Sequence, residues 1–543
     1  MLLWTWTCSS STLVSHAHVD THPVRRPFRD LGKTLNMLDH LSQALAPSFQ
    51  YYALGAAIAL FVCASAYAQV APRQPPKFPA PQLYDETGPI DLIALDKTIK
   101  EGFQNYKGKY FTLDEAHGET VILPTQFMEE LKALPDNMLN LDDEIDERFL
   151  SEYSLFTTTS VGGRISTVVN SVKNELTKAL GNLMGDIHEE VTYSVQELFP
   201  PCDDWTELDI QSKLVRVVAF VSGRIFVGLP MSRNQEYLDC IIEFTLNVFY
   251  AVPEIRTYPR PLRWTSRYFN AKVRAVHKSL ATMRRLMAPI ITDTKRQLEK
   301  GNGPHNMCAW NIKNSNQKER DSLNIQAQMQ LATSMAAIHT TSMTVTNAIF
   351  DLAARPEYLQ PLRDELRDVR ATESSPYLNK TSMPKLRKLD SFLKESHRLS
   401  PISLLNMRRK IVQPITLHDG TVLQPGMHIA FPLHQISNDE DLWENPSQFD
   451  GFRFQKLRDL PGNESKYQFT ATGTNNLDFG YGTHACPGRF FAANEIKMIL
   501  IHLIDKFDFK FKGDIGRPDS LWTPGGYHPD PSVRLLLRRR LKA

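Results

Sequence analysis

The stretch that most constrains the fold is Phe479–Ala492, FGYGTHACPGRFFA, in which a cysteine lies in a glycine-rich loop directly before an amphipathic segment. Gly480, Gly482 and Gly488 allow tight turns and let a flat ligand approach the backbone closely. Amide groups near a helix start favour negative charge, which biases the Cys486 sulfur towards thiolate. The pattern therefore predicts a loop, a thiolate ligand and a helix, in that order. The alternative is an inert, buried cysteine.

The cysteine stretch resembles the haem-binding signature of the cytochrome P450 superfamily, Phe-x-x-Gly-x-x-x-Cys-x-Gly. All four fixed positions match, namely Phe479, Gly482, Cys486 and Gly488. The resemblance implies bound haem b (iron protoporphyrin IX) with Cys486 as the axial iron ligand, and thiolate ligation in this family favours O–O cleavage. It also implies a mainly α-helical fold with small β-sheets.

A second informative segment, residues 323–354, is long and nearly uncharged, which predicts a buried helix. Part of it resembles the oxygen-binding groove of the same family, Ala/Gly-Gly-x-Asp/Glu-Thr-Thr. The small and hydroxyl positions of that groove are occupied by Ala336, Ala337, Thr340 and Thr341. The chain departs from the family at His339, which stands where the acid is usual. The resemblance implies that Thr340, His339 and Thr341 are catalytic and deliver protons. The alternative is a buried helix with a satisfied histidine.

A Glu-x-x-Arg pattern follows, formed by Glu395 and Arg398. Residues three apart share a helix face, so the two side chains can pair. A third partner, Arg453, is expected from the segment Phe449–Phe454, which resembles the Pro-Glu-Arg-Phe region of the family. The planar fork of arginine suits a buried bidentate network. The resemblance implies a structural role for the three residues beneath the haem.

Three basic side chains occupy positions where the family binds haem propionates. His484 lies in the cysteine loop, and Arg409 precedes a predicted strand region. Arg408 is an equally basic neighbour of Arg409. Lys173 falls in a segment, Val168–Leu180, that resembles the corresponding helix of fungal members, although the tryptophan usual in that helix is missing. A solvent-facing lysine is the alternative for Lys173.

Hydrophobic spacing predicts the remaining elements only coarsely. The Gly- and Asn-rich segment Gly301–Asn316, which contains Cys308, predicts a loop. Lys410–Phe431 predicts strands with a turn at Asp419 and Gly420. Four segments with apolar residues three and four apart are predicted helices: Met128–Leu134, Leu176–Ile187, Leu214–Val227 and Val273–Leu298.

The N-terminal part contains no charged side chain between His40 and Arg73. Its core, Tyr51–Ala68, is almost wholly apolar, and about 20 such residues span a bilayer core as a helix. The alternative is a signal peptide cleaved after Ala66-Tyr67-Ala68. We expect a tail over 1–48, a transmembrane anchor over 49–70, a proline-rich hinge over 71–83 and the haem-thiolate domain over 84–543. The resemblance implies a single-pass protein of the endoplasmic reticulum membrane with a cytosolic catalytic domain.

Composition narrows the range of partners. The 543 residues include 62 basic and 60 acidic side chains, a formal charge of +2 that argues against nucleic acid. The six cysteines are scattered and form no C-x-x-C pair, so no disulfide framework or cysteine zinc site is indicated. Flavin and nicotinamide motifs are missing, so the resemblance implies electrons from NADPH–cytochrome P450 reductase, with cytochrome b5 as a further donor. A monomer is expected.

Together these features predict a membrane-anchored monooxygenase that inserts one oxygen atom from O2 into a hydrophobic small molecule. Ser403–Asn406 is expected to line the substrate pocket beside Ala332 and Ala336. The runs around His339 and Glu395 resemble fungal members that oxidise terpenoids in secondary metabolism, including diterpenes, indole diterpenes and meroterpenoids. The alternatives are a haem-thiolate isomerase or dehydratase, and a non-catalytic haem- or lipid-binding membrane protein.

Overall fold

The computed structural model describes residues 52, 55–60, 62, 92–156, 165–373, 375, 377–523 and 526–540. The chain divides into two units, Met1–Gln74 and Pro75–Ala543. The described residues of the first unit are helical and exposed. Among the helices described, none combines the length and the apolar character needed to cross a membrane. The predicted tail, the hinge and most of the predicted anchor lie outside the described residues.

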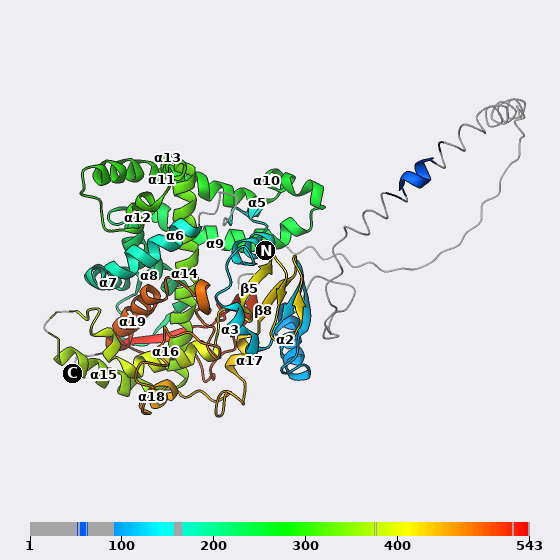
Figure 1. Ribbon diagram of the computed structural model, residues 1–543. Helices are drawn as coiled ribbons and strands as arrows, with labels where there is room; N and C mark the ends of the chain where they lie inside the picture. Colours follow the sequence, from blue (N-terminus) through cyan, green and yellow to red (C-terminus); the bar gives the residue numbers. More distant parts are fainter. Residues whose placement is uncertain are drawn as a thin grey trace, which may run out of the picture. The chain divides into compact units, whose positions relative to one another are not determined.

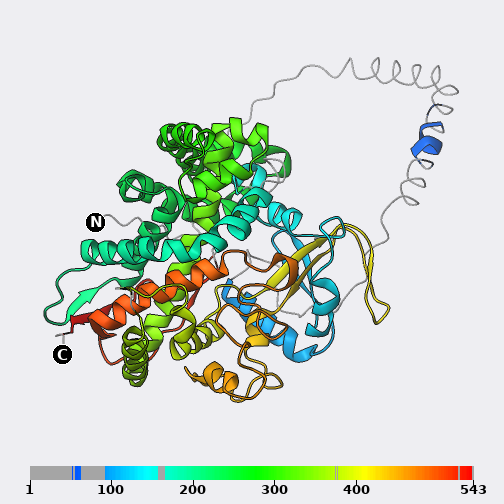
Figure 2. The same cartoon turned by 60° about the vertical axis from the view of Figure 1, so that its left-hand side comes forward.

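The second unit is mainly helical, as Figures 1 and 2 show. The helices are α2 (Leu92–Asn105), α3 (Met128–Leu131), α4 (Leu141–Phe149), α5 (Ser151–Ser154), α6 (Ile165–Ser171), α7 (Thr177–Leu198), α8 (Ile210–Phe226), α9 (Gln235–Arg256), α10 (Ser266–Phe269), α11 (Ala271–Glu299), α12 (Met307–Asn314), α13 (Gln317–Asp321), α14 (Leu323–Ala354), α15 (Leu359–Ala371), α16 (Arg387–Leu399), α17 (Leu433–Ser437), α18 (Arg453–Arg458) and α19 (Arg489–Lys506). A π-helical turn, Val172–Leu176, joins α6 to α7.

Short strands form four sheets in the part of the chain that the structure describes. The strands are β1 (Phe111–Glu115), β2 (Gly118–Ile122), β3 (Leu139–Asn140), β4 (Thr206–Leu208), β5 (Asn406–Ile411), β6 (Ile415–Thr416), β7 (Val422–Leu423), β8 (His428–Phe431), β9 (Phe507–Phe511), β10 (Leu521–Thr523), β11 (Gly526–His528) and β12 (Leu535–Arg539). The five-stranded sheet has the order β1-β2-β8-β5-β3, in which only β2 and β8 run parallel. A three-stranded sheet, β4-β12-β9, and two hairpins, β6-β7 and β10-β11, complete the set.

Helix α14 is the central element of the helical part (Figure 1). The Ser322 side chain accepts a hydrogen bond from the Ile325 amide and so caps the first turn. The helix ends at Ala354, and Pro356 follows two residues later, where a proline disfavours helical backbone in the residue before it. The helix packs against α8, α9, α11, α16 and α19. Because it has neighbours on most sides, most of its residues are buried, and these include polar side chains as well as apolar ones.

The structure departs from the sequence-based prediction at Gly301–Asn316, which is not all loop. Residues Met307–Asn314 form α12, and Cys308 is buried in it. The Asn306 side chain accepts a hydrogen bond from the Ala309 amide, so an asparagine expected in a loop acts as an N-cap. The predicted turn between β6 and β7 is present, with Gly420 at φ +85°.

Candidate active site

The loop before α19 holds Cys486 by a compact set of backbone hydrogen bonds. The Cys486 amide donates to the Phe479 carbonyl at 2.7 Å, and the Ala485 amide donates to the Gly482 carbonyl at 3.1 Å. Gly480 and Gly482 have φ values of +70° and +76°, a region that costs other residues energy. A Cβ at Gly482 would also lie 2.1 Å from the Lys132 carbonyl oxygen, so this position requires glycine.

Gly488 differs from the other two loop glycines, because its φ of −86° suits any residue. A Cβ there would meet only Val172, at 3.9 Å, so the backbone conformation does not require glycine at this position. Its amide and that of Arg489 hydrogen-bond to the Cys486 sulfur at the start of α19. The Arg489 guanidinium in turn donates to the Cys486 carbonyl at 2.8 Å. The helix start thus directs two N–H donors at one sulfur atom.

The Cys486 thiol is distinguished from the other described cysteines by both access and donors. Cys202, Cys240 and Cys308 are buried, whereas Cys486 is half-buried. Burial raises the pKa of the Cys486 thiol, and the Gly488 amide, the Arg489 charge and the Arg489 amide oppose that rise. Burial raises the pKa of Cys240 and of Cys308 to about 12. A metal ion at Cys486 would deprotonate the thiol outright.

One face of α14 is open although the rest of the helix is buried. Ala336 is exposed and Ala337 and Thr340 are partly accessible, while Thr341 is only 3 % exposed. The Thr340 hydroxyl donates to the Ala336 carbonyl at 2.8 Å. Because that bond uses its proton, the Thr340 oxygen presents lone pairs and accepts hydrogen bonds from a further donor. Small side chains on this face leave room for a flat group.

His339 lies on a different face of α14 from Thr340. Its Nε2 is 3.2 Å from the Ile242 carbonyl oxygen of α9, and since a carbonyl only accepts, Nε2 carries the proton. Burial lowers the pKa of His339 and the bond to Ile242 raises it. A neutral imidazole held against a neighbouring helix is a weak proton donor, so the structure favours a packing role for His339.

The basic side chains predicted for propionates gather around His484. Its pKa is lowered by burial, by Arg409 and by Lys173, and raised by Asp136. The His484 Nε2 lies 2.7 Å from the Asp136 Oδ1. Lys173 is exposed and belongs to the π-helical turn, a feature frequent at functional sites.

The structure also separates the two neighbouring arginines of β5. Arg408 binds both carboxylate oxygens of Glu115, at 2.7 and 2.8 Å, so it is already paired. Arg409 is only 7 % exposed and donates to the Arg408 carbonyl. No carboxylate of the described residues forms an ion pair with Arg409, and burial lowers its pKa to about 10. Burying an unpaired cation costs free energy, and a haem propionate beside Arg409 would offset that cost.

These observations meet the requirements of a haem group. The half-buried Cys486 with its two N–H donors would hold the iron, and the open face of α14 would accommodate the macrocycle. Arg409 would receive a propionate, with His484 and Lys173 nearby. Phe479, beside the loop, packs edge-on against the His397 ring at 5.5 Å.

The Glu-x-x-Arg network is present in full. Arg398 donates to both oxygens of Glu395 at 2.8 Å, and Arg453 donates to the same oxygens at 3.1 and 3.2 Å. The Asp450 amide adds a further bond to Glu395 at 3.0 Å. The three side chains are largely or fully buried, and Glu395 has no exposure. The network ties α16 to the segment that starts α18.

Sequence reasoning missed a buried polar cluster on the same helix. His397 has no hydrogen-bond partner on either ring nitrogen among the described residues, and burial lowers its pKa. Lys394 is fully buried and donates to the carbonyls of Gln468 and Ala471. Burial lowers the pKa of Lys394 to about 8. No sequence spacing distinguishes these two residues. They are unusual only because their polar side chains are buried, that of His397 against Phe479 of the cysteine loop.

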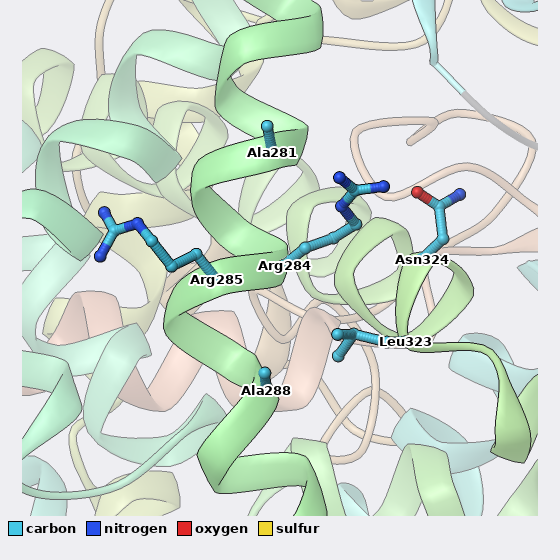
Figure 3. A pocket seen from close by; sticks show the side chains of 6 residues that line it. All are labelled: Ala281, Arg284, Arg285, Ala288, Leu323 and Asn324. Carbon is cyan, nitrogen blue, oxygen red and sulfur yellow. The ribbon is translucent and has the colours of Figure 1, made fainter.

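A surface pocket of about 370 Å³ lies away from these residues, between α11 and the first turn of α14 (Figure 3). Arg284 points towards Asn324 across the pocket, whereas Arg285 points away from it and pairs with Glu236. The lining residues are Ala281, Arg284, Arg285, Ala288, Leu323 and Asn324. None of the predicted site residues belongs to this pocket.

Comparison with known proteins agrees with the geometry. Residues 167–536 match the family model described as Cytochrome P450. The chain is 90 % identical over 535 residues to the Cytochrome P450 monooxygenase ORF5 of Penicillium roqueforti, covering 98 % of this chain and 99 % of the relative. Cytochrome P450 monooxygenase prx8 of Penicillium rubens has the same identity and coverage.

More distant similarity extends to a named oxidase and to a solved structure. The Ent-kaurene oxidase of Gibberella intermedia is 34 % identical over 450 residues, covering 81 % of this chain and 83 % of the relative. A cyanobacterial protein solved with bound retinoic acid has a TM-score of 0.62 at 15 % identity, covering 81 % of this chain and 94 % of that one. The second similarity concerns the fold alone.

Proposed function

The chain belongs to the cytochrome P450 family, and from that premise we propose that this fungal secondary-metabolism monooxygenase oxidises a terpenoid. The open face of α14 carries small apolar side chains at Ala332, Ala336 and Ala337, which suits a bulky hydrocarbon. One relative at 34 % identity is named for ent-kaurene, a diterpene hydrocarbon. That name is the observation that carries the terpenoid proposal, within which diterpenes, indole diterpenes and meroterpenoids are the candidate classes.

Each side chain of the site has a distinct role in binding the cofactor, delivering protons or bordering the substrate. Bound haem b would supply the dioxygen chemistry, in which two electrons and two protons are consumed, one oxygen atom enters the substrate and the other leaves as water. Cys486 would hold the iron as thiolate, and Arg409, His484 and Lys173 would bind the two carboxylates of the macrocycle. The Thr340 oxygen holds a water molecule that carries a proton to the oxygen site, and Thr341 packs behind it. Ser403–Asn406 borders the substrate side.

Electrons must come from another protein. We propose NADPH–cytochrome P450 reductase as the donor, with cytochrome b5 as a further one. The enzyme is proposed to be a monomer that residues 49–70 anchor in the endoplasmic reticulum membrane.

The test of the substrate class is metabolite profiling of a deletion strain, followed by feeding the accumulated compound to the purified enzyme and reductase. A terpenoid lacking one oxygen atom supports the proposal, and accumulation of a non-terpenoid precursor contradicts it. Product formed without NADPH would favour an isomerase or dehydratase.

Replacing Thr340 by alanine is expected to uncouple the enzyme. The variant keeps haem and substrate binding but diverts electrons to hydrogen peroxide, because the proton-carrying water loses its anchor. We expect product formed per NADPH consumed to fall by roughly tenfold, which is less than the ~10²–10⁴-fold effect of a positioned proton donor because other water can still deliver protons. Thr344→Ala is the matched control, since Thr344 lies one turn after Thr340 on the same helix and its hydroxyl likewise donates to a carbonyl one turn earlier, that of Thr340.

His339→Ala is expected to change this ratio less than Thr340→Ala, because the His339 ring is bound to α9. A decrease as large as that of Thr340→Ala would show that His339 takes part in proton delivery. An unchanged ratio of product to NADPH in Thr340→Ala would show that Thr340 does not take part in it.

The proposed cytosolic orientation makes a prediction about two Asn-x-Ser/Thr sequences, Asn379-Lys-Thr381 and Asn463-Glu-Ser465. Both are expected to remain without glycans. Each asparagine amide already donates a hydrogen bond, Asn379 to Glu373 and Asn463 to the Leu457 carbonyl. Endoglycosidase and protease treatment of intact microsomes measures this. A glycan at either site, or a protease-protected domain, would contradict the orientation and favour the signal peptide.

A further inference from the structure

Two histidines and a glutamate converge beside the five-stranded sheet. His117 lies in the turn between β1 and β2, His428 begins β8, and Glu144 belongs to α4. Their side chains are 4 %, 6 % and 1 % exposed, respectively. One potential ligand atom from each lies within 4.8 Å of the others, and the two imidazole rings meet edge to face at 4.9 Å. None of the three residues is among those predicted to bind haem, although burial lowers the pKa of Arg409 and the Glu144 charge raises it.

Each histidine has one buried ring nitrogen that forms no hydrogen bond with the described residues, namely His117 Nε2 and His428 Nδ1. A Glu115 carboxylate oxygen lies 4.0 Å from His117 Nε2, which is too long for a hydrogen bond. Leaving such atoms unpaired costs free energy. The other nitrogen of His428 lies 2.9 Å from the Glu147 carboxylate. Because a carboxylate only accepts, His428 Nε2 carries the proton and Nδ1 keeps a lone pair. A carboxylate that fixes the tautomer in this way is typical of metal-binding histidines.

The third group, Glu144, is also suitably placed. It accepts from Arg148 at 2.7 and 3.3 Å and lies 3.9 Å from Arg408. A carboxylate has about four lone-pair sites, so Glu144 retains capacity for a further partner. The charges around the cluster balance in three ion pairs: Glu115–Arg408, Glu144–Arg148 and Glu147–Lys410. No unpaired cation of the described residues occupies the cluster.

We propose that His117, His428 and Glu144 bind a divalent transition metal of the zinc type. Two imidazoles and one carboxylate form a common zinc ligand set, with a fourth position left for water. Zinc–nitrogen bonds of ~2.0–2.1 Å place tetrahedral ligands roughly 3.4 Å apart, so the side chains need to close by about 1 Å or a little more. The metal would join the β1–β2 turn, β8 and α4. The competing occupant is a water molecule that bridges the two free nitrogens.

Zinc uptake by the purified, haem-loaded protein tests the site. After dialysis against Zn²⁺, we expect one zinc per chain, quantified by mass spectrometry separately from iron. His117→Ala and His428→Ala are expected to weaken binding by at least tenfold. His418→Ala is the matched control, because His418 also pairs with a glutamate, Glu130, but its side chain is 57 % exposed. The carbon monoxide spectrum of each variant verifies that the haem domain is folded.

X-ray absorption spectroscopy at the zinc edge identifies the zinc ligands in the wild-type protein, so this test needs no substitution. Two imidazoles and one carboxylate in the first coordination shell are the expected result, and Glu144→Gln should remove the carboxylate contribution. Absence of bound zinc would contradict the proposal and favour the bridging water. Zinc that survives both histidine substitutions, or a shell without imidazole, would also contradict it. If the histidine variants do not fold, the wild-type spectrum alone decides.

Discussion

Cys486→Ser is expected to abolish monooxygenase turnover and the red-shifted Soret band of the reduced, carbon monoxide-bound protein. Serine cannot supply the thiolate that the Gly488 and Arg489 amides surround, and an alkoxide ligand is not available near neutral pH. The measurement is the reduced carbon monoxide difference spectrum together with product formation. The loss should be complete within detection, because no other described cysteine is half-buried in a glycine loop.

Cys202→Ser is the control for that substitution, since Cys202 is a buried free cysteine outside the site. It should retain both the band and turnover. Retention of the band in Cys486→Ser would refute the assignment of the iron ligand. Loss of the band in Cys202→Ser as well would mean that its loss in Cys486→Ser is not specific to the iron ligand.

Glu395→Gln is expected to destabilise the haem domain strongly. The substitution preserves shape but leaves the Arg398 and Arg453 guanidinium groups without their shared anion in a buried site. Removing one partner of a buried ion pair costs about 3–5 kcal/mol. The apparent melting temperature and the fraction of chains that hold haem should both fall, and thermal unfolding followed by the haem absorbance measures them.

A surface ion pair provides the contrast for Glu395→Gln. Arg367 and Asp368 pair at 3.1 Å with exposures near 70 %. Exposed pairs contribute about 0–1 kcal/mol, so Asp368→Asn should leave melting and haem content nearly unchanged. Equal melting temperatures for Glu395→Gln and the wild type would contradict the structural role of the network.

The parts of the site that the sequence predicts are those in which the pattern is local. The helix over 323–354 has the predicted limits, because an uncharged run with a serine cap leaves few alternatives. Glu395 and Arg398 are three residues apart on one helix, so their pairing follows from helix geometry. In the cysteine loop, Gly480 and Gly482 have the positive φ values that the glycine spacing suggests.

The parts that the sequence does not predict depend on contacts between distant segments. Arg408 and Arg409 are adjacent, and only Glu115, 293 positions away, shows that Arg408 is paired and Arg409 is not. His117, in the turn before β2, and His428, in β8, are likewise far apart in the sequence and are brought together because β2 pairs with β8. No spacing rule relates such residues. The α12 helix was missed for a different reason, because Asn306 serves equally well in a loop and as a cap.

Isotope incorporation shows whether the chain inserts oxygen from O2 by means of the Cys486 site. Purified enzyme, NADPH and reductase are supplied with ¹⁸O2 and the compound that accumulates in the deletion strain. We expect a product that carries one ¹⁸O atom and that forms only with NADPH. A product without ¹⁸O, or one formed at the same rate without NADPH, would refute oxygen insertion at this site.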